Sequence, residues 1–115
     1  MKILVCGGRD FRDRDKLVEI LDCIHTLTPI TYLVHGDAYG ADRFADWWAI
    51  RSTVTPLAYP ANWDKYGKAA GPIRNRQMLD ENPDIRLVVA FPGGVGTKNM
   101  TVLAKARNIK VMEIK

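Results

Sequence analysis

The sequence has little of what a metal centre, a disulfide scaffold or a membrane protein requires. It contains two cysteines and two histidines in 115 residues. Neither Cys6 nor Cys23 has a cysteine or histidine neighbour at metal-ligand spacing, so we expect no metal, no cofactor and two buried, reduced thiols. No apolar run has membrane-spanning length, and the glycines at 7–8 end the first one early. We therefore expect a cytoplasmic protein without a membrane partner.

The sequence also has no strong excess of charge of one sign. Lysine and arginine number 17 against 13 acidic residues, which gives a net charge of +4. This excess favours anionic partners. However, acidic residues are interleaved with basic ones, and there is no dense basic stripe with regular aromatic platforms. Binding to single-stranded nucleic acid is therefore kept only as the second of two alternative functions and is not expected.

Short apolar runs rich in β-branched residues alternate with helical patterns along the chain. Buried strands are predicted at residues 3–6, 31–34, 54–59, 85–91 and 111–114. Helices are predicted after Asp13 or Asp15, from 41 to about 51, around Pro72, and from Thr97 onward. Residues 60–71 are the one long connection, which makes them a candidate functional loop.

This alternation predicts an α/β fold. We expect one Rossmann-like, doubly wound domain over residues 1–115, with a five-stranded, mainly parallel sheet and helices on both faces. A hydrophobic content of 47% suits a single core, and a second domain would have too little apolar surface to bury. In such folds ligands bind beyond the carboxyl ends of the strands, where the strand order reverses.

The loop at residues 92–97 carries the strongest functional signal. Its glycines allow a phosphate to approach the backbone, and the helix that follows presents free N–H groups and a positive dipole end. Thr97 either caps this helix or donates its hydroxyl to a ligand. The alternative is a tight turn whose glycines serve packing only. The loop lacks the Gly-Lys-Ser/Thr ending of a P-loop, so an NTPase is not expected.

Side chains in the other loops have two interpretations each. Arg9 and Arg74 either pair with a phosphate or lie solvated. Asp42, in the first turn of a helix, either holds ribose hydroxyls or complements the helix dipole. Trp63 and Tyr66 either stack on a nucleobase or pack against the domain.

Five motifs, taken in order, resemble the YspA-like branch of the SLOG superfamily. They are Gly7-Gly8-Arg9-x-Phe11, His35-Gly36-Asp37-Ala38-x-Gly40-Ala41-Asp42, Ala61-Asn62-Trp63-x-x-Tyr66-Gly67, Ala70-Gly71-Pro72-Ile73-Arg74-Asn75 and Phe91-Pro92-Gly93-Gly94-x-Gly96-Thr97. The resemblance implies a Rossmann-like fold, binding of a nucleotide or nucleotide-derived ligand such as an ADP-ribose-like molecule, and a homo-oligomer, commonly a dimer.

The loops and the resemblance together define a set of expected ligand-binding residues. These are Gly7, Gly8, Arg9, His35, Gly36, Asp37, Gly40, Asp42, Asn62, Trp63, Tyr66, Arg74, Asn75, Pro92, Gly93, Gly94, Gly96 and Thr97. For His35, a hydrogen-bonded core position is favoured over a catalytic base.

One position argues against cleavage of the ligand. The related Lonely guy phosphoribohydrolases carry a glutamate three residues after the threonine of the glycine loop, and this chain has Met100 there. Their helix motif also has a lysine where this chain has Asn75. A methionine can neither accept a proton nor stabilise a cationic sugar. We therefore expect a sensor or sequestering protein; the alternative is a nucleotide N-glycosidic hydrolase with Arg74 and Asp42 as catalytic candidates.

Overall fold

Five parallel strands form the central sheet of the computed structural model, which describes residues 1–115. They are β1 (Lys2–Cys6), β2 (Tyr32–His35), β3 (Thr55–Ala58), β4 (Ile85–Ala90) and β5 (Lys110–Glu113), in the order β3-β2-β1-β4-β5. The chain builds outward from β1 to β3 and then returns to place β4 on the other side of β1. The strand order therefore reverses between β1 and β4, and the predicted sheet is confirmed.

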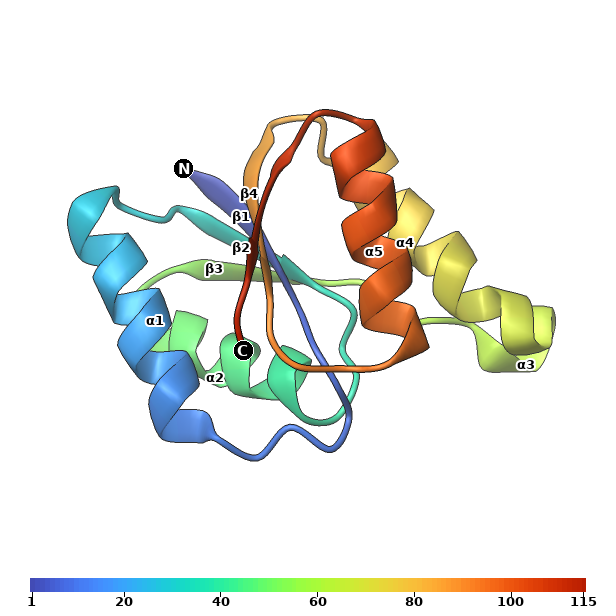
Figure 1. The fold of residues 1–115 in the computed structure, drawn as a ribbon, viewed down its shortest axis with the longest axis horizontal. Helices are drawn as coiled ribbons and strands as arrows, with labels where there is room; N and C mark the ends of the chain where they lie inside the picture. The colour runs from blue at the N-terminus through green and yellow to red at the C-terminus, as the bar shows by residue number, and fades with distance from the viewer.

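Helices cover both faces of this sheet (Figure 1). The helices α1 (Arg14–Leu27) and α2 (Ala41–Arg51) lie on one face, and α4 (Ala70–Glu81) and α5 (Val95–Ala106) lie on the other. This arrangement confirms the doubly wound Rossmann-like fold. None of the helices combines the length and the apolar character that crossing a membrane demands.

Strand β1 shows why the central strands are continuous apolar runs. Ile3 and Val5 belong to the core under α1 and α2, whereas Leu4 and Cys6 belong to the core under α4 and α5. Because both faces are covered, successive residues are all buried. The expectation of buried strands is wrong for β3 and β5, which are only partly buried because they lie at the two edges of the sheet. The expectation of two buried thiols is wrong for Cys23, which is exposed, because helical spacing turns it away from the buried face of α1.

Two segments differ from the sequence prediction. Residues 60–71 contain the short helix α3 (Trp63–Tyr66) and the 3-10 turn η1 (Gly67–Ala69), which leads into α4. Asn62 caps α3, its Oδ1 accepting a hydrogen bond from the Lys65 N–H at 3.1 Å. Helix α5 begins at Val95 with Gly94 as its N-cap, so Thr97 lies inside the first turn and does not cap the helix.

Candidate functional site

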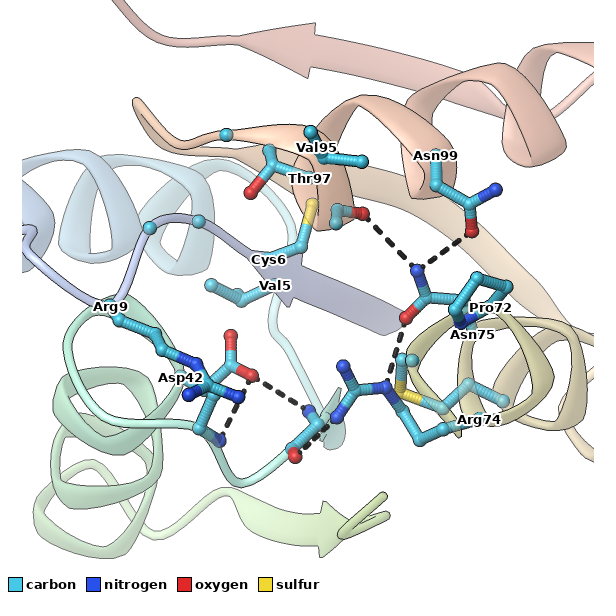
Figure 2. Close-up of a pocket in the computed structure, with 18 of the residues that line it drawn as sticks. Val5, Cys6, Arg9, Asp42, Pro72, Arg74, Asn75, Val95, Thr97 and Asn99 are labelled. Carbon is cyan, nitrogen blue, oxygen red and sulfur yellow. Dashed lines mark hydrogen bonds between the residues drawn. The ribbon is translucent and has the colours of Figure 1, made fainter. Parts of the chain in front are cut away.

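A cavity of about 490 Å³ opens where the loops that follow β1, β2, β3 and β4 meet (Figure 2). This volume lies in the range of small-molecule sites. The cavity is at the reversal of strand order, as expected for this architecture. The structure brings together these predicted residues along its walls: Gly7, Gly8, Arg9, Gly36, Asp42, Trp63, Arg74, Asn75, Gly94, Gly96 and Thr97.

The glycines of the two central loops have different physical roles. A Cβ added to Gly8 would lie 3.0 Å from the Cα of Gly93, and the Gly8 N–H donates to the Pro92 carbonyl at 2.9 Å. These two glycines therefore let two backbones pack together; for Gly93 this agrees with the packing alternative given for the loop at residues 92–97. A Cβ on Gly94 or Gly96 would meet no atom within 4 Å. Packing within the protein thus does not explain these last two glycines.

The N-terminal end of α5 forms one wall of the cavity. Its Gly94 cap provides no side-chain acceptor, and its first turn has no acidic residue. The Lys98 N–H is the first to find a backbone acceptor, the Gly94 carbonyl at 3.1 Å. The N–H groups of Val95, Gly96 and Thr97 have no acceptor in the protein. Free donors and the positive end of the helix dipole therefore face the cavity.

Arg74 is held at the opposite wall by three hydrogen bonds. Its Nη1 donates to the carbonyls of Gly36 at 2.6 Å and Tyr59 at 3.5 Å, and its Nε donates to Asn75 Oδ1 at 3.0 Å. Nη2 has no protein acceptor and points into the cavity (Figure 2). Burial lowers the pKa of Arg74, although Asp42 opposes this shift. An arginine keeps its charge in proteins, so the cavity contains a fixed cation.

Asn75 connects this arginine to α5. Its Nδ2 donates to the Gly96 carbonyl at 3.2 Å and to Asn99 Oδ1 at 3.0 Å, while its Oδ1 accepts from Arg74. The side chain lines the cavity, but its polar atoms are bonded to the protein. Its observed place is a bridge that fixes Arg74 relative to the first turn of α5.

Asp42 is a buried carboxylate with one unused oxygen. Its Oδ2 accepts hydrogen bonds from the backbone N–H groups of Gly36 at 3.2 Å and Ala38 at 3.3 Å. Its Oδ1 has no hydrogen-bond partner. Burial raises the pKa of Asp42, although the N–H groups and the nearby His35 and Arg74 oppose the shift. The bonds of Asp42 hold the loop after β2 rather than its own helix.

Changing Asp42 to asparagine is expected to stabilise the fold by roughly 1 kcal/mol at neutral pH, because it removes a buried charge; the amide keeps one unmatched polar group at the place of Oδ1, so the gain comes from the charge alone. Since burial raises its pKa, folded wild type binds a proton more readily than the unfolded chain, and it gains stability as pH falls through the raised pKa. The advantage of the variant therefore disappears below about pH 4, the unfolded value. Urea unfolding of both proteins across pH measures this, and a less stable variant at neutral pH would contradict it.

The mouth of the cavity adds further cations. The Arg9 guanidinium lies 5.4 Å from the centroid of the Trp63 ring, and both side chains are exposed. Lys68 from η1 also lines the cavity, although sequence analysis did not single it out. Arg9, Lys68 and Arg74 thus face a single carboxylate, Asp42, which favours an anionic ligand.

The floor of the cavity was missed by sequence reasoning. It includes Val5, Cys6 and Met78, which belong to the apolar pattern of β1 and α4. Burial raises the pKa of Cys6 far above its usual value, so the thiol stays protonated. The other lining residues that were not predicted are Ala38, Lys68, Gly71, Pro72, Val95 and Asn99. Ala38, Gly71 and Pro72 belong to the quoted motifs, whereas Lys68, Val95 and Asn99 are indicated only by their closeness to predicted residues in the sequence.

Seven predicted ligand contacts lie outside the cavity walls. They are His35, Asp37, Gly40, Asn62, Tyr66, Pro92 and Gly93. His35 is fully buried and has both nitrogens occupied: Nδ1 accepts from the Asp37 N–H at 2.9 Å, and Nε2 lies 2.7 Å from Asp46 Oδ2. The Asp37 N–H makes Nδ1 an acceptor, so Nε2 carries the hydrogen and donates it. His35 is therefore a structural residue, the interpretation favoured from the sequence.

The fold is that of a Rossmann-like α/β protein, and it has a cavity at the reversal of strand order. Residues 1–66 match the YspA, cpYpsA-related SLOG family, YAcAr. The chain is also 34% identical to the Gene 61 protein of Mycobacterium phage D29, over 96% of this chain and 94% of that protein. It therefore belongs to the YspA, cpYpsA-related SLOG family, and this membership indicates a nucleotide-related function. No solved structure matches it.

Proposed function

We propose that the protein binds a nucleotide or a nucleotide-derived ligand in this cavity, with a phosphate at the N-terminal end of α5. The convergence of free α5 N–H groups with three cationic side chains on one cavity carries the proposal. Backbone N–H groups at a helix start and arginine guanidinium groups are the donors that phosphates prefer. The open Gly94 and Gly96 leave the approach to these N–H groups unobstructed.

The other end of the ligand would lie at the mouth of the cavity. The Trp63 side chain is 47% exposed there, and an exposed aromatic ring can stack on a nucleobase. Met100, at the position of the glutamate in the hydrolytic relatives, is fully buried in the core between α5 and the sheet. This supports a role in sensing or sequestering the ligand rather than in cleaving it by the route of those relatives.

Replacing Gly96 by alanine tests where the phosphate lies. The added methyl group meets open space in the protein, and alanine is favoured over glycine within helices by about 0.5–1 kcal/mol, so the fold should not be destabilised. At the cavity wall the same methyl group would obstruct the phosphate. We expect affinity to fall by about tenfold or more, the loss of one good contact to a charged group.

Isothermal titration with AMP and with ADP-ribose measures this loss, and urea unfolding measures stability. The matched control is Val102→Ala, an exposed position on α5 outside this cavity, which should leave both quantities close to wild type. Unchanged affinity in Gly96→Ala would contradict phosphate binding at this helix.

A further inference from the structure

Asp42 conflicts with a site that serves only to bind an anion. Three cations line the cavity, yet a carboxylate that is only 5% exposed lies among them. A negative charge there opposes a phosphate, and a buried polar atom without a partner costs free energy. Such an oxygen is compensated when a bound ligand brings a hydrogen-bond donor to it. This inference concerns the same cavity and rests on the proposed function.

The hydrogen bonds of Asp42 within the protein involve only one of its two carboxylate oxygens. Oδ2 holds the loop after β2 through Gly36 and Ala38. Oδ1 is turned away from these N–H groups and toward the cavity (Figure 2), and it is buried from solvent without a partner. Arg74 does not supply one, because its bonds go to Gly36, Tyr59 and Asn75. The missing partner of Oδ1 is thus provided neither by the protein nor by bulk water.

The surroundings of Asp42 restrict the kind of donor. Arg9, Lys68 and Arg74 would repel a cationic amine, so a neutral donor is favoured. In a nucleotide with its phosphate on α5 and its base at Trp63, the sugar lies between the two and carries neutral hydroxyl donors. Arg9 is exposed, and its guanidinium makes no hydrogen bond, so it is free to change position when a ligand binds.

We propose that Asp42 Oδ1 accepts a hydrogen bond from a ribose hydroxyl, so that the cavity selects ribonucleotides over deoxyribonucleotides. A site built around a hydrogen bond to a hydroxyl discriminates against the analogue that lacks it, because the buried acceptor is then left unpaired.

The experiment compares AMP with 2′-deoxy-AMP and 3′-deoxy-AMP by isothermal titration, with inorganic phosphate as a minimal probe. Wild type should bind AMP about ten- to hundredfold more tightly than at least one deoxy analogue, the value of a hydrogen bond to a charged group. Asp42→Asn should lose most of this preference. The amide oxygen of asparagine takes over the bonds to Gly36 and Ala38, which leaves a neutral NH₂ group facing the hydroxyl. That group can donate only a neutral hydrogen bond to the hydroxyl oxygen, so the stronger bond to a charged acceptor is gone.

The same variant should bind inorganic phosphate as well as wild type or more tightly, because a negative charge has been removed. This opposite response separates specific recognition from damage to the fold, which would weaken both ligands. The matched control is Asp15→Asn, which makes the same change of charge at an exposed position on α1 and should keep the preference for AMP.

Equal binding of AMP and both deoxy analogues by wild type would overturn the assignment of Asp42 and leave the proposed function standing. Weaker binding of both AMP and inorganic phosphate by Asp42→Asn would also overturn it, since Asp42 would then act only through the fold. If wild type binds neither AMP nor inorganic phosphate, the proposed function itself fails, and this inference fails with it.

Discussion

Arg74→Ala is expected to lower the affinity for a nucleotide by about a hundredfold, the upper range for losing a hydrogen-bonded charge in a cavity. The guanidinium presents its free Nη2 to the cavity and is held there by Gly36, Tyr59 and Asn75. Removing it also takes away a cation that offsets the charge of Asp42, so the cavity becomes less favourable to a phosphate.

Isothermal titration of Arg74→Ala against AMP measures this loss. Arg76→Ala is the matched control, because Arg76 lies on the same helix but is exposed and does not line the cavity. The control removes the same charge and should change the affinity by less than about threefold, as expected of a screened surface charge. Equal effects of the two substitutions would show that only net charge matters and would contradict a built phosphate site.

Gly36→Ala is expected to lower affinity and to cost about 1–3 kcal/mol of stability, the range for overpacking a buried position. A Cβ at residue 36 would lie 2.3 Å from Arg74 Nη1 and 3.0 Å from Asp42 Oδ2. Since real Cβ atoms do not come so close, the guanidinium must leave the Gly36 carbonyl to which it is bonded. One methyl group thus displaces the main cation of the cavity.

A double-mutant cycle tests whether the clash with Arg74 causes the loss of stability in Gly36→Ala. In an Arg74→Ala background the closest clash no longer exists, so Gly36→Ala should cost clearly less stability than in wild type. Urea unfolding of the four proteins measures this difference. Additive costs would contradict the account, because they would mean that Gly36 is required for a reason unrelated to Arg74.

Much of the fold could be predicted because burial leaves a direct pattern in the sequence. Strand β1 lies between two helical layers, so Ile3 through Cys6 are all apolar and the strand is recognisable from composition alone. The order of strands and helices then restricts the topology to a doubly wound sheet. The meeting of the loops at one edge follows from that topology and not from any single motif.

Helix α3 could not be predicted, because hydrophobic periodicity arises only where one face of a helix is buried, and α3 has no buried residue. All four of its residues, Trp63 to Tyr66, are exposed. Its local signal is the cap made by Asn62, an amide that the resemblance had suggested as a ligand contact. A polar side chain that caps a helix and one that binds a ligand are the same residue type, and only coordinates distinguish them.

In the candidate site, too, the sequence indicates which residues are involved but not which role each residue has. The sequence gives no reason to distinguish the glycines at positions 93 and 94. In the structure, however, Gly93 is crowded by Gly8 and Thr97, whereas Gly94 faces open space. Asn75 belongs to a motif that suggested ligand contact, but its amide bridges Arg74 and Gly96. These distinctions depend on which backbones approach each other across the sheet edge, and no local pattern encodes that.

Met100 bears on whether the protein would cleave a bound ligand. Its full burial places an apolar side chain in the core where the hydrolytic relatives have a carboxylate. Asp42 is the buried carboxylate that does line the cavity, and its bonds tie it to the loop after β2. Both placements support the proposal that the cavity binds an anionic ligand that carries a neutral hydrogen-bond donor.

The most direct test follows the backbone amide signals of the uniformly ¹⁵N-labelled protein during titration with AMP, with adenosine as the phosphate-free control. AMP is expected to shift the amides of Val95, Gly96 and Thr97 most strongly, because these N–H groups have no acceptor in the protein. Adenosine should leave these three signals nearly unchanged. Saturating AMP without a shift at any of the three amides would contradict phosphate binding at α5.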